Sequence, residues 1–346
     1  MTLARPSYRD IPLYAPSKGP ECPIDLSDNT NLFGVPPAAE RALREAVAGR
    51  VTRYPSLYGG ALKAAIAAYA GCAPEQVVTG CGSDDVIDCT LRAFVGEGER
   101  LAFPDPTFVM MPIFAKVNGI QAVPVPLTRE GDIDAEGLLA TRAKVLYLCT
   151  PNNPTGTVAS RAAVERVLNE APGIVLLDEA YAEFARESYL EAARTRRNVL
   201  VTRTLSKAFG LAGMRVGYAV GAPELVSEVE KARGPYKISS VAERMAEAAL
   251  TEDLEWVRAR AAEAVEVRER LAAELVRQGL RPLRSEANFA FVPLPGAPEV
   301  ARRMRERGVN VRAFQGLTGI GDALRIGCGP WPLMEAALKA LQEARG

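Results

Sequence analysis

A lysine and an aspartate each follow an apolar segment of the sequence. Lys207 comes shortly after a predicted strand at 199–203, Asp178 comes directly after one at 174–177, and Tyr181 follows three residues later. Alone, such residues are more often a surface lysine and a helix N-cap. In open α/β folds, however, ligands bind at the carboxyl ends of strands, where a partly desolvated lysine can form a Schiff base. The aspartate could keep a ring nitrogen protonated, so together the two residues indicate chemistry on a bound heterocyclic carbonyl compound.

A phosphate site is available in the same part of the chain. The run GCGSDD at 80–85 joins a predicted strand to a helix, so backbone N–H groups, the Ser83 hydroxyl and the helix dipole converge on one point. Arg215, eight residues after Lys207, could add a charge-assisted contact. Because position 85 is Asp and not the third Gly of a dinucleotide fingerprint, a nicotinamide-linked dehydrogenase is disfavoured.

Two further segments offer groups that could contact a ligand. The run PNNPTG at 151–156 is a rigid turn that can hold the Asn153 amide against a ligand oxygen, although a plain turn is the simpler interpretation. Arg325 is embedded in the apolar run LRIG at 324–327. A buried guanidinium needs an anion, which is either a substrate carboxylate or a structural carboxylate of the protein itself.

The composition excludes several kinds of active site. The chain has 346 residues and no histidine, which excludes Ser-His-Asp and Cys-His catalysis and His-ligated metal sites. Its 42 Lys and Arg residues balance 42 Asp and Glu residues, so no overall field favours nucleic acid or an anionic membrane. The six cysteines lack the Cys-x-x-Cys spacing of zinc or redox sites. With no signal peptide or apolar span apparent, we expect a cytoplasmic protein without a metal.

Strands and helices alternate along much of the chain. Apolar strands are expected at 76–79, 100–103, 123–126, 144–149, 174–177, 199–203 and 216–220. Two of them, 144–149 and 174–177, are apolar throughout, which is typical of a parallel sheet covered on both faces. A long amphipathic helix at 252–278, followed by short strands and helices, predicts a smaller α+β domain. The expected organisation is an N-terminal arm at 1–35 that joins the small domain, a large α/β domain at 36–251 and a small domain at 252–346.

Taken in this order, the segments resemble a known family. The similarity is carried by four runs, PNNPTG at 151–156, DEAY at 178–181, TLSKAF at 204–209 and LAGMR at 211–215. They are similar to runs in the pyridoxal-phosphate-dependent aminotransferases of fold type I, class I/II, and within that group the chain most resembles the histidinol-phosphate aminotransferases. The resemblance implies a large domain around a mostly parallel seven-stranded sheet, a smaller α+β domain, and a homodimer with shared active sites.

The resemblance also implies roles around the cofactor, pyridoxal 5′-phosphate. Lys207 would bind it covalently and move the substrate proton, Asp178 would hold the ring nitrogen protonated, and Tyr181 with Asn153 would contact the phenolic oxygen. Phe108, where the family more often has tyrosine, would stack on the ring. Around the phosphate would lie Ser83, Asp84, Thr204, Ser206, Arg215 and, from the neighbouring subunit, Tyr54.

The implied substrate contacts come from both ends of the chain, at Tyr14, Asn31, Arg312 and Arg325. Arg325 would bind the carboxylate of an amino or keto acid, while Tyr14 and Arg312 would lie near the distal group of the substrate. Asn31 belongs to the run NTNL at 29–32, where the family usually has Asn-Glu-Asn-Pro, and Arg312 to an expected loop at 311–315.

These implications predict transamination from L-histidinol phosphate to 2-oxoglutarate, giving imidazole acetol phosphate and L-glutamate in histidine biosynthesis. An aromatic amino acid aminotransferase is the first alternative, because Tyr14, Phe108 and Phe314 could frame an apolar pocket. A phosphothreonine-type decarboxylase would share the cofactor site but release carbon dioxide. A catalytically silent dimeric binding protein of the same fold is the non-enzymatic alternative.

Overall fold

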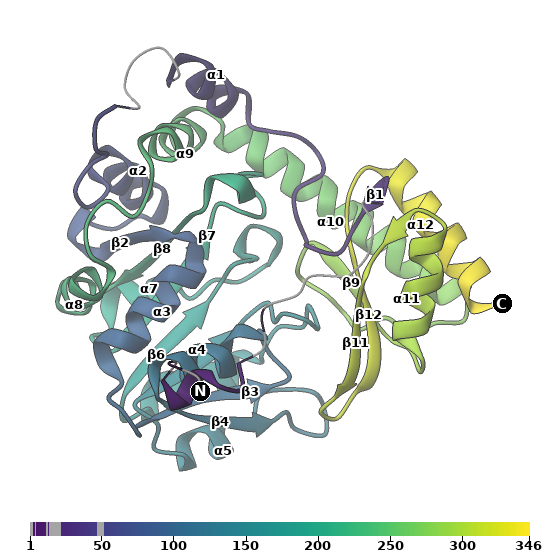
Figure 1. Cartoon of the computed structure of the whole chain (residues 1–346), viewed down its shortest axis with the longest axis horizontal. Helices are drawn as coiled ribbons and strands as arrows, with labels where there is room; N and C mark the ends of the chain where they lie inside the picture. Colours follow the sequence, from purple (N-terminus) through teal and green to yellow (C-terminus); the bar gives the residue numbers. More distant parts are fainter. Residues whose placement is uncertain (1–2, 4, 12, 14–21, 47–51) are drawn as a thin grey trace.

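The computed structural model describes residues 3, 5–11, 13, 22–46 and 52–346, which form the two lobes seen in Figure 1. The larger lobe is built on a seven-stranded sheet with the order β2-β8-β7-β6-β5-β3-β4. Its strands are β2 (Val77–Cys81), β3 (Arg100–Asp105), β4 (Gln121–Pro126), β5 (Val145–Cys149), β6 (Ile174–Asp178), β7 (Val199–Thr204) and β8 (Val216–Gly221). Only β8 runs in the direction opposite to the other six strands, so the expected mostly parallel α/β sheet is confirmed.

Helices cover both faces of this sheet, which explains why its central strands β5 and β6 are buried along their whole length. One layer consists of α3 (Gly82–Phe94), α4 (Met110–Asn118) and α8 (Pro223–Arg233). The other consists of α2 (Gly60–Ala70), α5 (Ala135–Ala140), α6 (Arg161–Glu170), α7 (Leu190–Thr195) and α9 (Ser240–Glu252), with α1 (Pro37–Ala46) packed on α9. Strand residues alternate between the layers: Tyr147 packs in the first and Leu146 and Leu148 in the second.

The smaller lobe follows the long helix α10 (Leu254–Arg277), which runs between the lobes in Figure 1. It contains a three-stranded antiparallel sheet and two helices, namely β11 (Arg312–Leu317), β12 (Gly321–Gly327), β9 (Phe289–Pro293), α11 (Ala297–Glu306) and α12 (Trp331–Arg345). A short strand ahead of the larger lobe, β1 (Ile24–Asp25), pairs with β10 (Val309–Asn310). Leu26 packs in the core of the smaller lobe, and the proposed domain boundary at 252 falls on the last residue of α9.

The expectation of a loop at 311–315 was wrong. Arg312 begins β11, which pairs antiparallel with β12 so that Arg312 lies opposite Arg325. The strand is only partly buried and has an irregular register between Phe314 and Leu317. Both features weaken the alternation of apolar and polar residues by which a strand is identified from sequence.

A buried ion pair joins the ends of β6 and β7. Arg203 donates from Nη2 to Glu179 Oε2 over 2.7 Å and to the Ser188 hydroxyl over 2.7 Å, and Glu183 lies 3.9 Å from its other terminal nitrogen. Breaking such a pair leaves an uncompensated buried charge, so it fixes the two strands relative to one another. It lies on the face of the sheet opposite Asp178.

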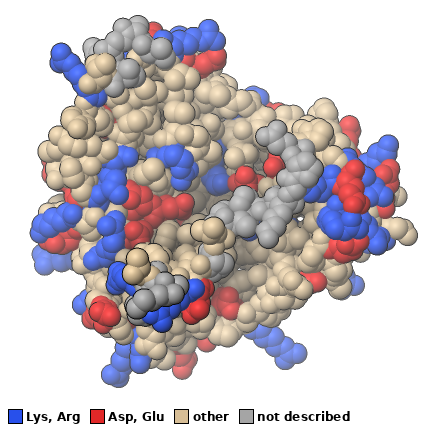
Figure 2. Space-filling model, in the orientation of Figure 1, with Lys and Arg blue, Asp and Glu red and all other residues tan. Residues whose placement is uncertain are grey.

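The surface carries mixed charge. On the face drawn in Figure 2, basic and acidic side chains lie close to one another over both lobes. Among the helices of the described residues, none has the length and apolar character needed to cross a bilayer.

Candidate active site

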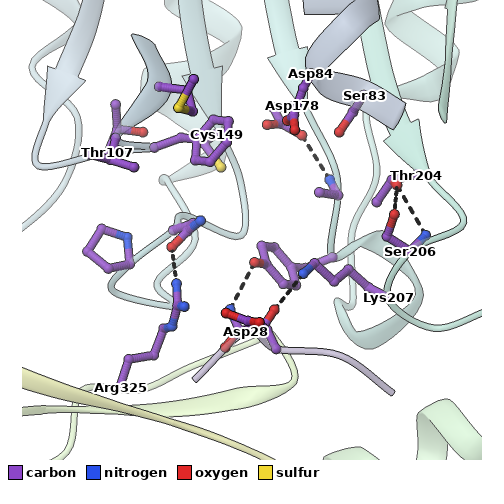
Figure 3. Close-up of a pocket in the computed structure, with 18 of the residues that line it drawn as sticks. Asp28, Ser83, Asp84, Thr107, Cys149, Asp178, Thr204, Ser206, Lys207 and Arg325 are labelled. Atoms are coloured by element: carbon purple, nitrogen blue, oxygen red, sulfur yellow. Dashed lines mark hydrogen bonds between the residues drawn. The ribbon is translucent and has the colours of Figure 1, made fainter. Parts of the chain in front are cut away.

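A cavity of about 480 Å³ opens where the carboxyl ends of the parallel strands face the smaller lobe. Thirteen residues singled out from the sequence line it, as Figure 3 shows in part: Ser83, Asp84, Phe108, Asn153, Asp178, Tyr181, Thr204, Ser206, Lys207, Arg215, Arg312, Phe314 and Arg325. The carboxyl ends of parallel strands share one edge of a sheet, which is why segments distant in sequence meet here.

Lys207 follows β7 and reaches across the cavity. Its Nζ donates to the backbone carbonyl of Asp28 over 2.9 Å and lies 6.0 Å from the centre of the Tyr181 ring. Burial, with help from the nearby Arg325 charge, lowers the pKa of Lys207 to about 8. A larger fraction of the amine is therefore neutral near physiological pH, as attack on a carbonyl group requires.

Asp178 ends β6 in the interior of the protein. Its carboxylate accepts from the Tyr147 hydroxyl over 2.7 Å and from the Ala180 amide over 3.1 Å. Burial raises the pKa of Asp178 to about 6, with Asp84 adding to the shift. No ion pair to Asp178 occurs among the described residues, so a buried carboxylate faces the cavity without a cation. A protonated ring nitrogen is the chemical partner it fits.

Hydrogen-bond donors gather at the amino end of α3. Gly82 has φ 82°, and a Cβ there would come within 2.5 Å of Arg215, so glycine allows the guanidinium to approach. Arg215 lies 3.6 Å from Asp84 and 3.4 Å from the Ser206 hydroxyl, which in turn accepts from Thr204. Helix amides, two hydroxyls and a guanidinium thus face one space, an arrangement that fits a phosphate group.

Tyr181 and Asn153 each keep a donor available for a ligand. Asn29 Nδ2 donates to the Tyr181 oxygen over 3.1 Å, which leaves the tyrosine O–H to donate elsewhere. Asn153 Oδ1 accepts from Arg325 over 2.5 Å, which leaves its amide nitrogen to donate. Burial raises the pKa of Tyr181 to about 12, so its proton is retained. These residues therefore fit the phenolic oxygen of pyridoxal phosphate.

Of the two asparagines in the run NTNL at 29–32, Asn29 lines the cavity, whereas Asn31, expected from the sequence to contact substrate, does not. Asn31 Nδ2 donates to the Ala208 carbonyl over 2.9 Å, and its Oδ1 accepts from the Phe33 amide over 2.8 Å. Asn29 is buried with φ 55°, and this left-handed conformation turns the segment at that point.

Of the two remaining expected residues, Tyr54 does not line the cavity of this chain. Tyr54 is 83% exposed and stacks on Tyr236, with ring centres 4.8 Å apart. Tyr14 lies outside the described residues. An exposed tyrosine held by a stacking partner is available to a second chain.

One wall of the cavity was not expected from the sequence. Val109, Met110 and Phe114 line it from α4 and the residue before it, beside Phe314 from β11. Met110 and Phe114 are four residues apart, the spacing that puts two side chains on one face of a helix. This spacing could have indicated a wall of the cavity. Apolar residues that pack in the core of the larger lobe have the same spacing, however, so the sequence does not distinguish the two.

Comparison with known proteins agrees with this geometry. The family model for aminotransferase class I and II matches residues 22–341. An aromatic amino acid aminotransferase of Corynebacterium efficiens is 39% identical over 90% of this chain and 92% of its own, and a histidinol-phosphate aminotransferase of Roseiflexus castenholzii is 38% identical over 92% and 89%. The crystal structure of histidinol-phosphate aminotransferase from Sinorhizobium meliloti in complex with pyridoxal-5′-phosphate superposes with a TM-score of 0.88, at 26% identity, over 99% of this chain and 98% of that one.

Proposed function

The chain belongs to the class I and II aminotransferases and is a pyridoxal-phosphate-dependent enzyme, and on this premise we propose that it transfers the amino group of L-histidinol phosphate to 2-oxoglutarate. The products would be imidazole acetol phosphate and L-glutamate, a step in histidine biosynthesis. The observation that carries the proposal is that Arg312 and Arg325 lie opposite one another on β11 and β12 and both line the cavity.

Two guanidinium groups suit substrates that present anions at different positions. Arg325 is buried, donates to Asn153 and lies beside the aromatic rings of Phe289 and Phe314, which restrict its orientation. It would bind the carboxylate of the keto acid beside the reacting carbon. Arg312 would bind the phosphate of histidinol phosphate in one half-reaction and the second carboxylate of 2-oxoglutarate in the other.

The residues of this chain divide the chemistry among them. Bound pyridoxal phosphate supplies a ring that accepts electron density from the reacting carbon of the substrate. Asp178 holds the proton on the ring nitrogen, because its buried carboxylate is satisfied by a cation at that point. Lys207 would take the proton from the substrate Cα and hold it for return on the same side of the cavity, because its lowered pKa keeps a larger fraction of the amine neutral. Tyr181 and Asn153 orient the ring by donating to its phenolic oxygen.

An aromatic amino acid donor is the second candidate, favoured by the apolar wall of the cavity. Phe108, Val109, Met110 and Phe114 offer a surface for an aromatic side chain, and the relative from C. efficiens bears that activity in its name. The only anion of such a donor is its α-carboxylate, which Arg325 would bind, and it has no phosphate for Arg312. The contribution of Arg312 to each donor therefore distinguishes the two candidates.

Replacing Arg312 with leucine is expected to lower kcat/KM for L-histidinol phosphate by about 10- to 100-fold, the worth of charged hydrogen bonds to phosphate. Activity with L-phenylalanine should change by less than about threefold, because that donor carries no phosphate for Arg312 and its single anion, the carboxylate, would bind Arg325. The measurement is an absorbance titration of the cofactor-loaded protein with each donor in a separate cuvette. L-Glutamate and O-phospho-L-threonine are included.

The matched control is Arg281→Leu, which removes an exposed arginine far from the cavity. Wild-type protein that reacts with L-phenylalanine but not with L-histidinol phosphate would transfer the assignment to the aromatic donor. Carbon dioxide release from O-phospho-L-threonine would instead indicate the decarboxylase.

The proposal includes a homodimer in which Tyr54 contacts the cofactor phosphate of the neighbouring subunit. Its support is that Tyr54 is exposed, lies away from its own cavity and is held by Tyr236, whose backbone has φ 58°. A left-handed conformation at a tyrosine is uncommon and costs energy. The surrounding structure therefore determines the orientation of the Tyr236 ring, on which Tyr54 stacks.

Mixing an inactive variant with an impaired one is expected to raise activity if Tyr54 acts across the subunits. A hybrid of a Lys207→Ala chain and a Tyr54→Ala chain contains one site with both native residues. At limiting cofactor, where a hydrogen bond to phosphate is worth about tenfold, this hybrid with its single native site should exceed the Tyr54→Ala parent by about fivefold and the Lys207→Ala parent by far more. A hybrid of Lys207→Ala with Asp178→Ala is the control, because both residues line the same cavity and no complete site forms. Equal activity of the two hybrids would contradict the shared site.

A further inference from the structure

Three carboxylates line the cavity, and the proposed function uses two of them. Asp178 faces the position of the ring nitrogen, and Asp84 lies 3.6 Å from Arg215 at the phosphate end. The third, Asp28, comes from the segment between β1 and α1 and lies beside Lys207 in Figure 3.

Asp28 lies between the two cations nearest the reaction. Its backbone carbonyl accepts from Lys207 Nζ over 2.9 Å, and the carbonyl of the preceding residue, Ser27, accepts from Arg325 over 2.7 Å. Its carboxylate accepts from the Ser27 hydroxyl over 3.3 Å. Asp28 is exposed, and no ion pair to its carboxylate occurs in the part of the chain that the structure describes.

The negative charge of Asp28 affects the pKa of the Lys207 amine. Among the groups around Lys207, Arg325 lowers the pKa of the lysine and Asp28 opposes that effect. The carboxylate therefore lies within electrostatic reach of the point at which the amino group is transferred. An amino donor arrives there as an ammonium group, whereas the keto acid that replaces it brings a carbonyl and no positive charge.

We propose that Asp28 is a donor-selecting residue, whose carboxylate binds the ammonium group of the incoming amino substrate beside Lys207. The same negative charge opposes the carboxylates of the incoming keto acid, so Asp28 favours one half-reaction over the other. This inference rests on the proposed transamination but not on the identity of the donor, because every amino donor carries the ammonium group. L-Glutamate and 2-oxoglutarate form a matched pair of probes, since they share both carboxylates and differ only at the reacting nitrogen or oxygen.

The test is Asp28→Asn, which preserves the size of the side chain and leaves the backbone carbonyl to Lys207. In single half-reactions of the cofactor-loaded protein, kcat/KM for L-glutamate should fall about tenfold, while that for 2-oxoglutarate should stay constant or rise. A second readout uses cofactor-free protein. The pH at which Lys207 becomes reactive toward an amine-modifying reagent should move down, because the opposing charge is gone.

Glu75→Gln serves as the control, since it removes one exposed carboxylate far from the cavity and should change neither half-reaction. An equal fall for L-glutamate and 2-oxoglutarate would overturn the proposal and assign Asp28 a structural role. Unchanged rates with both probes would overturn it as well. Failure of the histidinol phosphate assignment would appear separately, as a wild-type protein that reacts with L-glutamate but not with L-histidinol phosphate.

Discussion

Lys207→Ala protein is expected to lose transamination by on the order of 10⁴-fold or more, because one side chain supplies both the covalent link and the proton transfer. The chain contains no histidine that could take over the proton. In the described structure, the Asp178 carboxylate already accepts hydrogen bonds from the Tyr147 hydroxyl and the Ala180 amide. The pKa of Tyr181 is raised to about 12, so its hydroxyl stays protonated. Neither Asp178 nor Tyr181 can therefore replace Lys207 as the base. The measurement is the rate of each half-reaction with saturating cofactor.

A second readout separates loss of chemistry from loss of binding. Borohydride treatment should attach the cofactor to wild-type protein at Lys207, as a mass increase on the peptide that contains it, and should leave Lys207→Ala protein unlabelled. The phosphate cradle around Ser206 and Arg215 remains in the variant, so the cofactor should still co-elute with it. Lys231→Ala, which changes an exposed lysine paired with Glu228, is the matched control. A Lys207→Ala protein that turned over at the wild-type rate would refute the assignment.

The central sheet could be predicted because its strands are buried on both faces. The strand expected at 144–149 is observed as β5, Val145–Cys149, and that at 174–177 as β6, Ile174–Asp178. Continuous apolar runs bounded by turn residues leave few alternatives. Since the carboxyl ends of parallel strands share one edge, residues such as Asp178 and Lys207 could be expected to meet without knowledge of the loops.

The substrate side of the cavity could not be predicted in the same detail. Asn29 and Asn31 are equally polar and two residues apart, and only the left-handed backbone at Asn29 decides which one faces Tyr181. Arg312 was expected on a loop but begins β11. This strand is partly exposed and its register is irregular, so its sequence lacks the clear alternation of apolar and polar residues that identifies a strand. The role of Tyr54 depends on a second chain, and it stays a prediction. Local sequence patterns carry little information about such long-range contacts.

Asp178→Asn is expected to affect the loaded and the cofactor-free protein in opposite directions. In the cofactor-free protein, burial raises the pKa of Asp178 to about 6, so ionising this group in the folded state costs free energy. The unfolded chain holds that proton less tightly, so stability falls as pH rises from about 4 through 6. Removing the charge should therefore stabilise the cofactor-free protein at pH 7, by on the order of 2 kcal/mol.

In the loaded protein the same substitution removes the anion that keeps the ring nitrogen protonated. We expect kcat to fall by about 10²- to 10³-fold, the typical loss when one preorganised electrostatic partner of a reaction is removed. Wild-type protein should also bind the cofactor more weakly as pH falls through about 6, because the carboxylate becomes neutral. The variant should show no such dependence.

Thermal unfolding of both cofactor-free proteins, cofactor titrations between pH 5 and 8, and half-reaction rates test these three expectations. Glu97→Gln, which changes an exposed carboxylate, controls for net charge. A variant that is less stable without cofactor and unchanged in kcat would mean that Asp178 serves the fold alone. A gain in stability together with the loss in kcat would mean that the buried Asp178 carboxylate lowers the free energy of unfolding of the cofactor-free protein. It would also mean that the protonated ring nitrogen offsets this loss when the cofactor binds.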